Sequence, residues 1–265
     1  MSATTRPGLL LPLWSLFARE VLRFARQPGR VAGALGTPLL FWVVLGSGFG
    51  SSLRPAGTAA GMSYLTYFLP GTVLMVVLFT AIFSSISVIQ DRTEGFLQGV
   101  LAAPVPRLSI VLGKVLGGAA LGMAQGVLLV LLAPLAGMTY GVGQFLAACG
   151  VLALAAVGLG ALGFLFAWRT DSVQGFHAVM NLLLFPMWLM SGAFFPVGGA
   201  AGWVQWIMRA NPLTYGLSAL RGVLTGAAAP ALGEPGLGLS LAVLVAFAAG
   251  TLALAALLAR HSETR

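Results

Sequence analysis

Six long runs of apolar residues dominate the chain, and most of the charged residues lie in the stretches between them. A helix rises about 1.5 Å per residue and the hydrocarbon core of a bilayer is about 30 Å thick, so a span needs roughly 20 mostly apolar residues. The pattern therefore predicts an all-α integral membrane fold with about six transmembrane helices. The predicted spans are Val31–Gly48, Tyr67–Ile89, Ile110–Leu132, Gln144–Ala167, Phe176–Phe195 and Leu237–Leu258.

The segment 8–28, which precedes the first span, has the period of an amphipathic helix. Apolar side chains and basic side chains fall on opposite sides when each residue turns the helix by about 100°. The apolar side carries Leu10, Leu13, Trp14, Phe17, Val21 and Phe24, and the polar side carries Arg19, Arg23 and Arg26, followed just beyond the segment by Arg30. Glu20 also belongs to this helix. We expect this helix to lie in the membrane interface, either as a topology anchor or as a docking surface for a partner.

The loop 91–107, between the second and third spans, contains a short apolar helix between charged ends. Four apolar residues share one helical face, and Pro104 and Pro106 end the helix because proline lacks a backbone N–H. Those four residues are Phe96, Leu97, Val100 and Leu101. The spacing fits an ordinary interfacial turn, and it also fits an apolar knob that a partner could bind.

The segment 196–236 is too apolar for an ordinary loop, yet neither of its apolar pieces is long enough to span. The first contains Trp203 and Trp206 and ends at Asn211-Pro212. Two re-entrant or interfacial helices on the outer side fit this pattern. An arginine at the bilayer centre costs about 2.5 to 3.5 kcal/mol on insertion scales, so we expect Arg209 and Arg221 near the outer interface.

Composition agrees with a membrane environment. Of the 265 residues, 58% are hydrophobic and only 8% are charged, whereas an average soluble protein has about 25% charged residues. The net charge of +8 would suggest nucleic acid in a soluble protein. Here the charges cluster between apolar runs, so we expect them to set topology and attract anionic lipid, with no nucleic-acid partner.

The basic residues also predict the orientation. With the N-terminus inside, eleven of the 14 lysines and arginines fall on the inner side and three, Arg54, Arg209 and Arg221, on the outer side. This positive-inside bias places both termini in the cytoplasm. The inner residues are Arg6, Arg19, Arg23, Arg26, Arg30, Arg92, Arg107, Lys114, Arg169, Arg260 and Arg265.

Three glycines in the third predicted span, Gly118, Gly122 and Gly126, are four residues apart. Such a ridge lets a neighbouring membrane helix approach closely. Gln125 lies deep in the same span, where an uncharged amide usually bonds across helices. These residues predict helix packing rather than chemistry.

The sequence lacks the chemistry that would let the chain act alone as a pump or an enzyme. A P-loop needs a first glycine and a Gly-Lys-Ser/Thr, but Gly113-Lys114 is followed by Val115, and Leu108 replaces the first glycine. We find no carboxylate near the middle of a span, as ion-coupled carriers usually have. No paired carboxylates, nucleophile–histidine–acid arrangement or metal motif is present, so we expect no catalytic site and no cofactor. A separate ATPase subunit is the natural energy source.

Several of these segments together resemble the type-2 ABC transporter permeases, most closely the branch associated with antibiotic resistance and Nod-factor export. The resemblance covers essentially the whole chain, and the motifs are specific in combination. They are Phe68–Gly71, Gln90–Leu97, Leu101–Arg107, Val111–Lys114, Asn211–Tyr215 and Leu220-Arg221. One departure is Pro106, where the family often has serine.

The resemblance implies a permease of the bacterial cell membrane that pairs with a second permease copy, as a homodimer or heterodimer, and with a cytoplasmic ABC ATPase. The helix at 95–103 would be the coupling helix and segment 8–28 the connecting helix. We expect an outer gate at Asn211, Pro212, Tyr215 and Arg221. The charged frame of the coupling loop would be Asp91, Arg92, Glu94, Arg107 and Lys114, with Gly95, Phe96, Leu97 and Pro104 shaping the helix.

The resemblance also implies an amphipathic, drug-like or lipid-like cargo that moves outward, and the apolar spans fit a cargo of this kind. Two alternatives stay open. The cargo could be a polysaccharide or lipid-linked glycan, guided by aromatic residues. These residues would be Trp14, Phe41, Trp42, Tyr64, Tyr67 and Phe68. The chain could instead be a stand-alone channel or secondary carrier, which would transport without ATP.

Overall fold

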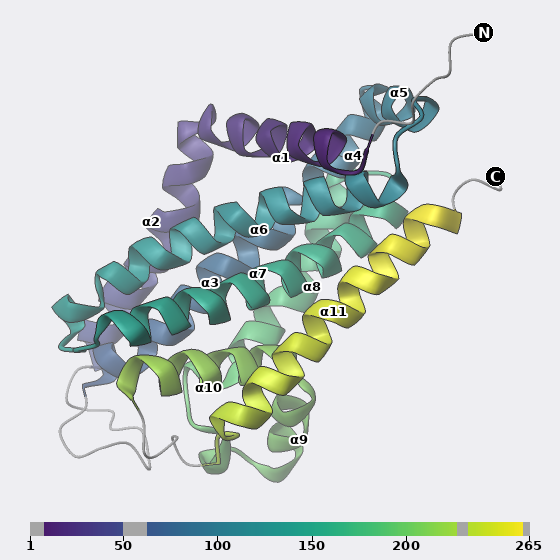
Figure 1. Cartoon of the computed structure of the whole chain (residues 1–265). Helices are drawn as coiled ribbons and strands as arrows, with labels where there is room; N and C mark the ends of the chain where they lie inside the picture. Colours follow the sequence, from purple (N-terminus) through teal and green to yellow (C-terminus); the bar gives the residue numbers. More distant parts are fainter. Residues whose placement is uncertain (1–7, 50–62, 227–232, 262–265) are drawn as a thin grey trace, which may run out of the picture.

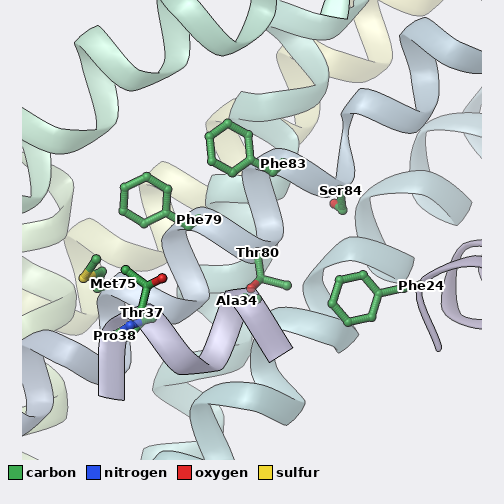
Figure 2. A pocket seen from close by; sticks show the side chains of 10 residues that line it. Phe24, Ala34, Thr37, Pro38, Met75, Phe79, Thr80, Phe83 and Ser84 are labelled. Atoms are coloured by element: carbon green, nitrogen blue, oxygen red, sulfur yellow. The ribbon is translucent and has the colours of Figure 1, made fainter. Parts of the chain in front are cut away.

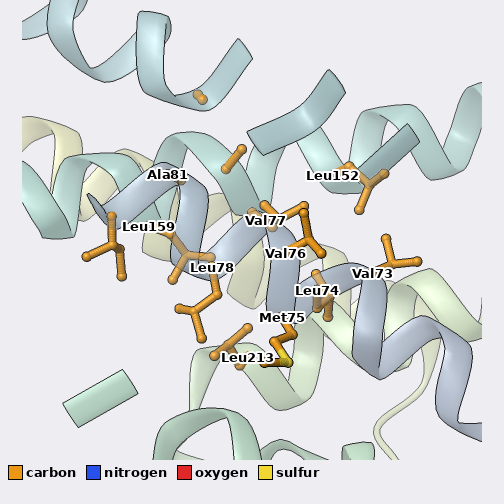
Figure 3. Packing of buried hydrophobic residues seen from close by; sticks show 14 of the residues in the cluster. Val73, Leu74, Met75, Val76, Val77, Leu78, Ala81, Leu152, Leu159 and Leu213 are labelled. Carbon is orange, nitrogen blue, oxygen red and sulfur yellow. The ribbon is translucent and has the colours of Figure 1, made fainter. Parts of the chain in front are cut away.

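Helix α3 (Tyr64–Ser84) lies at the centre of the fold, and nearly all of its side chains are buried. Figure 3 shows its apolar residues from Val73 to Ala81 packed among Leu152 and Leu159 of α7 and Leu213 of α10. Because every face of α3 meets another helix, its sequence is apolar all round rather than striped. The remaining elements are arranged about it.

The computed structural model describes residues 8–49, 63–226 and 233–261, which are mostly helical and contain no strand. The other α-helices are α1 (Leu10–Ala25), α2 (Pro28–Phe49), α4 (Ile86–Thr93), α5 (Phe96–Ala102), α6 (Arg107–Leu131), α7 (Val142–Arg169), α8 (Val173–Trp188), α9 (Gly202–Ala210), α10 (Pro212–Thr225) and α11 (Leu237–His261). Two 3₁₀ turns, Ala133–Ala136 and Val197–Gly199, and a π-helical turn, Leu189–Ala193, complete the described chain.

The prediction of six spans is confirmed. Six helical segments in the described part of the chain are long and apolar enough to cross a membrane. They are Ala32–Phe49, Tyr64–Thr93, Arg107–Leu131, Val142–Arg169, Val173–Ala193 and Leu237–Arg260. The second is the longest, because α4 continues α3 after a break at Ser85.

The elements between the spans gather at two ends of the bundle (Figure 1). Helices α1, α4 and α5 lie at one end, which we call the basic end. Helices α9 and α10 lie at the other, which we call the outer end after the orientation predicted from the sequence. Among the residues used for the charge bias, Arg6, Arg54 and Arg265 lie outside the described residues, as does the stretch 227–232 of the predicted outer segment.

The two short helices predicted before the last span are present as α9 and α10, and the chain breaks between them at Asn211-Pro212. Asn211 caps α10, since its side-chain oxygen accepts a hydrogen bond from the Leu213 N–H at 3.0 Å. Arg221 lies in α10. It is 6% exposed and enclosed by protein, because an internal acidic partner compensates its charge.

Helix α6 meets α3 through its glycines. A Cβ atom at Gly122 would lie 3.2 Å from the Val77 carbonyl oxygen, and one at Gly126 would lie 2.8 Å from the Val77 side chain. Gly118 faces Ser84 in the same way. The three glycines, four residues apart, thus face α3. Because the two backbones approach closely there, the α6 side chains beside the glycines come within reach of α4.

Candidate functional site

Helix α1 packs along the N-terminal half of α6, and two further glycines of α6 make room for it. A Cβ atom at Gly113 would lie 2.7 Å from the Leu16 Cβ, and one at Gly117 would lie 2.7 Å from the Glu20 Cβ. Both distances are too short for real atoms, so a larger residue would push the helices apart. This contact buries Leu16 and Glu20. The Glu20 side chain therefore faces the protein rather than solvent.

Lys114 of α6 extends into the space between α1 and α4. Its Nζ donates hydrogen bonds to the carboxylates of Glu20 on α1 and Asp91 on α4, and to the Ser87 hydroxyl at 3.2 Å. All three donors of the ammonium group are therefore used. The Lys114 side chain is 3% exposed and that of Asp91 is fully buried.

Two arginines of α1 complete the arrangement around Asp91. Arg19 donates to Asp91 Oδ2 at 2.7 Å, and Arg23 donates to Asp91 Oδ1 at 3.1 Å. A second nitrogen of Arg23 lies 3.6 Å from Glu94 Oε1. The hydrogen bond to Asp91 raises the pKa of the Arg19 guanidinium above its ordinary value, so Arg19 is charged at every working pH.

We call the six residues Arg19, Glu20, Arg23, Asp91, Glu94 and Lys114 the ion cluster. It contains three cations and three anions, so its charges cancel. A buried charge is tolerated when it is paired and hydrogen-bonded, whereas removing one partner of a buried pair typically costs 3 to 5 kcal/mol. The cluster therefore fastens α1, α4 and α6 to one another and strongly disfavours their separation.

Helix α5 begins directly after the cluster and is attached to it. Gly95 has a φ of 79°, which only glycine adopts readily, and this turns the chain from α4 into α5. The Arg19 guanidinium lies 3.7 Å from the centre of the Phe96 ring, a cation–π contact. A displacement of α5 would therefore act on α1 directly.

The apolar face predicted for α5 is only partly exposed. Leu97 is 4% exposed and belongs to the core, while Phe96 is 37% exposed. The face turns inward because Leu97 completes the core beside α4. Leu97 thus anchors α5 in the core, and Phe96 is the large apolar side chain of α5 that is exposed.

The other charged residues of the loop lie apart from the cluster. Arg92 donates to the carbonyl oxygens of Trp168 at 2.6 Å and Thr170 at 3.2 Å, which ties α4 to the end of α7. Arg107 begins α6, and Pro104 lies exposed in the turn before it. Arg26 at the end of α1 is exposed and is not part of the cluster.

A second buried ion pair lies at the outer end. Arg221 of α10 pairs with Glu234, and its guanidinium carbon lies 4.2 Å from the centre of the Tyr67 ring. Arg221 also donates to the Tyr67 carbonyl oxygen at 3.3 Å, and the Tyr67 hydroxyl donates to the Gly192 carbonyl oxygen at 2.9 Å. These contacts join α3, α10 and the π-helical turn.

Asn211 holds the same turn from the other side. Its amide donates to the carbonyl oxygens of Met187 at 2.6 Å and Met190 at 3.1 Å. The irregular backbone there leaves carbonyl groups that a regular helix would use, and Asn211 satisfies them. Pro212 starts α10, and the Tyr215 hydroxyl donates to the Arg209 carbonyl at 2.8 Å. Of the four residues predicted for an outer gate, Asn211 and Arg221 thus contact the π-helical turn, whereas Tyr215 contacts Arg209 of α9.

The profile of the ABC-2 type transporter family matches residues 12–225, well over half of the chain. The chain belongs to this family. It is therefore a membrane subunit of an ABC transporter, and a transporter rather than a catalytic enzyme. The matched region contains the whole ion cluster and all of α5, so the charged arrangement lies within the part shared with the family.

Named relatives of this ABC-2 transporter subunit are similar over most of their length. Nodulation protein J of Rhizobium meliloti (strain 1021) is 27% identical over 198 residues, 74% of each chain. The inner membrane transport permease YadH of Escherichia coli (strain K12) is 26% identical over 211 residues, 79% of this chain and 81% of the relative. The putative transport permease ycf38 of Cyanophora paradoxa is 25% identical over 222 residues, 83% and 76% of the two chains.

Sequence reasoning missed how this ABC-2 subunit assembles its charges. It placed Lys114 in the frame of a loop, whereas Lys114 is the buried centre that joins Glu20 to Asp91. The glycines Gly113 and Gly117 were not recognised as the contact for α1, although their four-residue spacing repeats that of the ridge facing α3. No group of three metal-ligating side chains occurs among residues 8–49, 63–226 and 233–261.

Proposed function

We propose that the chain is the permease of an exporter driven by a separate cytoplasmic ABC ATPase, which docks on α5 and the adjoining polar side of α1. The ion cluster carries this proposal. It binds α1, α4 and α6 into one unit at the point where α5 presents Phe96. A push on α5 would reach three helices at once, and two of them continue into spans.

The orientation follows from the charge bias. We place the basic end in the cytoplasm, where positively charged segments of membrane proteins are retained. The relative YadH is named an inner membrane permease, which supports the cytoplasmic membrane as the location. Both termini would then be cytoplasmic.

ABC-2 permeases work with ATP-binding subunits, and we propose that two permease copies form the transport path between them. Glu20, Asp91 and Glu234 are buried, but each is paired with a cation at one end of the bundle. None is positioned as a proton carrier in the middle of a span. This distribution supports an external driver and disfavours a secondary carrier.

For the cargo we propose an amphipathic or hydrophobic molecule. The glycan alternative relies on aromatic residues that line a path, yet Trp42, Tyr64, Tyr67 and Phe68 are between 0% and 6% exposed. They form a packed core in this conformation. Export would require the outer end to open, and the contacts of Arg221 and Asn211 would have to break there.

The test uses inside-out vesicles that contain the permease and its co-purified ATPase. We expect Phe96→Ala and Glu94→Ala to insert normally but to lose ATP-dependent accumulation of lipophilic dyes and the stimulation of ATP hydrolysis. Leu135→Ala is the matched control, because Leu135 is 77% exposed at the outer end. Coupling through α5 is wrong if the first two variants bind the ATPase and transport like the wild type.

A further inference from the structure

A groove of about 620 Å³ runs between α7 and α11 near the basic end of the bundle, where Figure 1 shows the two helices side by side. Its volume falls within the range of about 300 to 1,000 Å³ that is usual for small-molecule sites. Two of its leucines, Leu254 and Leu257, are about half exposed, so the groove opens to the lipid around the spans. The lining residues are Leu162, Leu165, Phe166, Arg169, Thr170, Leu254, Leu257 and Leu258.

The packing of α11 leaves this groove beside it. Deeper in the span the two helices touch, since the Thr251 hydroxyl donates to the Gly158 carbonyl at 3.2 Å, and a Cβ atom at Gly158 would lie 3.2 Å from the Ala248 Cα. Nearer the basic end, α11 buries Ala255 and Ala259. Because these side chains are short, the larger leucines beside them flank a groove that protein side chains do not fill.

A cation lies within the groove itself. Arg169 shares a face of α7 with Leu162 and Phe166, because residues three, four and seven positions apart lie on one side of a helix, and all three line the groove. Arg169 is exposed, and within the described part of the chain it pairs with no carboxylate. The nearby Asp171 lies 3.6 Å from Arg92. This end of the groove is therefore net positive.

Arg169 lies where a lipid headgroup would be. It is the last residue of the span Val142–Arg169 and follows Trp168, and both residue types are common at the ends of spans. A guanidinium binds phosphate through paired N–H donors, and basic residues at the membrane surface attract anionic lipid. From Arg169 the apolar wall continues into the span as far as Leu162, a rise of about 10 Å. A charged end above an apolar wall matches the two parts of an anionic phospholipid.

A hollow of about 330 Å³ between α1, α2 and α3 provides a contrast. Figure 2 shows Phe24 of α1 at one side, with Phe79 and Phe83 of α3 facing Ala34 and Thr37 of α2. None of the described residues that line this hollow is charged. It therefore offers nothing that would select a headgroup, whereas the groove at Arg169 does.

We propose that the groove between α7 and α11 binds an anionic phospholipid, with the phosphate on Arg169 and an acyl chain along the leucines. The lipid braces α11 against α7 beside Thr170, whose carbonyl accepts a hydrogen bond from Arg92 of α4 at 3.2 Å. Its presence thereby stabilises the attachment of α4, the helix that leads into α5. The assignment to the cytoplasmic leaflet rests on the orientation proposed above.

The test uses purified permease without any ATPase, in vesicles of phosphatidylcholine with the probe in both leaflets, so that neither ATPase coupling nor orientation affects the result. The probe is a trace of phosphatidylglycerol or of phosphatidylcholine with a photoreactive group on its acyl chain, and labelled peptides are mapped. We expect phosphatidylglycerol to label the peptides that contain Phe166 and Leu254 about fivefold more than phosphatidylcholine does. Any label on the α3 peptide that contains Phe79 should not depend on the headgroup.

Two variants with matched controls test the headgroup and the groove separately. Arg169→Gln should lower the phosphatidylglycerol label to the level of phosphatidylcholine, whereas Arg209→Gln removes the same charge from an exposed arginine of α9 and should change nothing. Leu254→Trp should fill the groove and reduce the label from both probes. Val245→Trp, at a similarly exposed position of α11 outside the lining, should keep it.

Three results would overturn the proposal. Equal labelling by both probes in the wild type, or an unchanged phosphatidylglycerol label in Arg169→Gln, would show that Arg169 selects no lipid. Unchanged labelling in Leu254→Trp would show that the lipid lies elsewhere. Absence of label from both probes would show that protein, such as a second permease copy, covers the groove.

Discussion

Lys114 and Asp91 form a buried ion pair although they lie 23 residues apart on different helices. Lys114 makes a second pair with Glu20, which is 94 residues away. One ammonium group thus holds the first helix of the chain against the end of the second span. This geometry makes the basic end a single mechanical unit rather than a set of separate loops.

Loss of the central cation should destabilise this unit. Lys114→Met leaves Glu20 and Asp91 buried without their shared partner, and breaking a buried pair costs about 3 to 5 kcal/mol. We expect a decrease of this size in the free energy of unfolding, measured by reversible denaturation in mixed micelles. The triple variant Lys114→Met, Glu20→Gln, Asp91→Asn has no unpaired buried carboxylate and should regain part of the loss. A change below about 1 kcal/mol in Lys114→Met, the range of exposed ion pairs, would contradict a central role.

The close contact between α1 and Gly117 of α6 should not tolerate an alanine at this position. In Gly117→Ala the new Cβ would lie 2.7 Å from the Glu20 Cβ, and overpacking of this kind costs about 1 to 3 kcal/mol. Gly150→Ala is the control, because a Cβ there meets nothing within 4 Å. It should stabilise helix α7 by roughly 0.5 to 1 kcal/mol. We expect Gly117→Ala to lower the free energy of unfolding and Gly150→Ala to raise it in the same assay. Equal changes in the two variants would show that α1 is not held at Gly117.

The stability of the basic end should not depend on Arg19 titration. A group whose pKa is raised in the folded state contributes stability that is present below its unfolded pKa and is lost as pH rises through the folded pKa. Because the hydrogen bond to Asp91 raises the pKa of Arg19 above its ordinary value, which is already strongly alkaline, the wild type should keep this contribution through alkaline pH. Arg19→Lys brings a group with an unfolded pKa of about 10.4. Its stability should fall relative to the wild type above that pH, and parallel pH profiles would contradict the ion pair with Asp91.

The pair at the outer end should behave as a buried pair. Arg221→Met leaves Glu234 buried without a cation, whereas the double variant Arg221→Met, Glu234→Met removes both charges. Replacing both partners of a buried pair by apolar residues is often neutral or stabilising, while removing one costs about 3 to 5 kcal/mol. We therefore expect the single variant to unfold more easily than the double variant. Arg209→Met, at an exposed arginine, should match the wild type, and equal stability of the single and double variants would refute the pairing.

Much of the fold could be predicted because lipid imposes a simple rule on sequence. Every described span coincides with a long apolar run, and the break at Asn211-Pro212 is visible from proline chemistry. The ion cluster could not be predicted, because the pairing of Glu20, Asp91 and Lys114 depends on helix packing over long separations. The burial of Leu97 and of Arg221 could not be predicted for the same reason. A short apolar helix and an isolated arginine reveal nothing in sequence about which neighbours enclose them.

The most direct test of the central claim is site-specific photo-cross-linking from α5. A photoreactive amino acid is placed at Phe96 or at the exposed Gln98, and at Trp206 of α9 as a control that is 73% exposed at the outer end. Native membranes are irradiated and the cross-linked partners are identified by mass spectrometry. We predict that both α5 positions capture an ATPase with a P-loop, and that Trp206 does not. Failure of both α5 positions to capture such an ATPase, in membranes where the permease co-purifies with one, would contradict it.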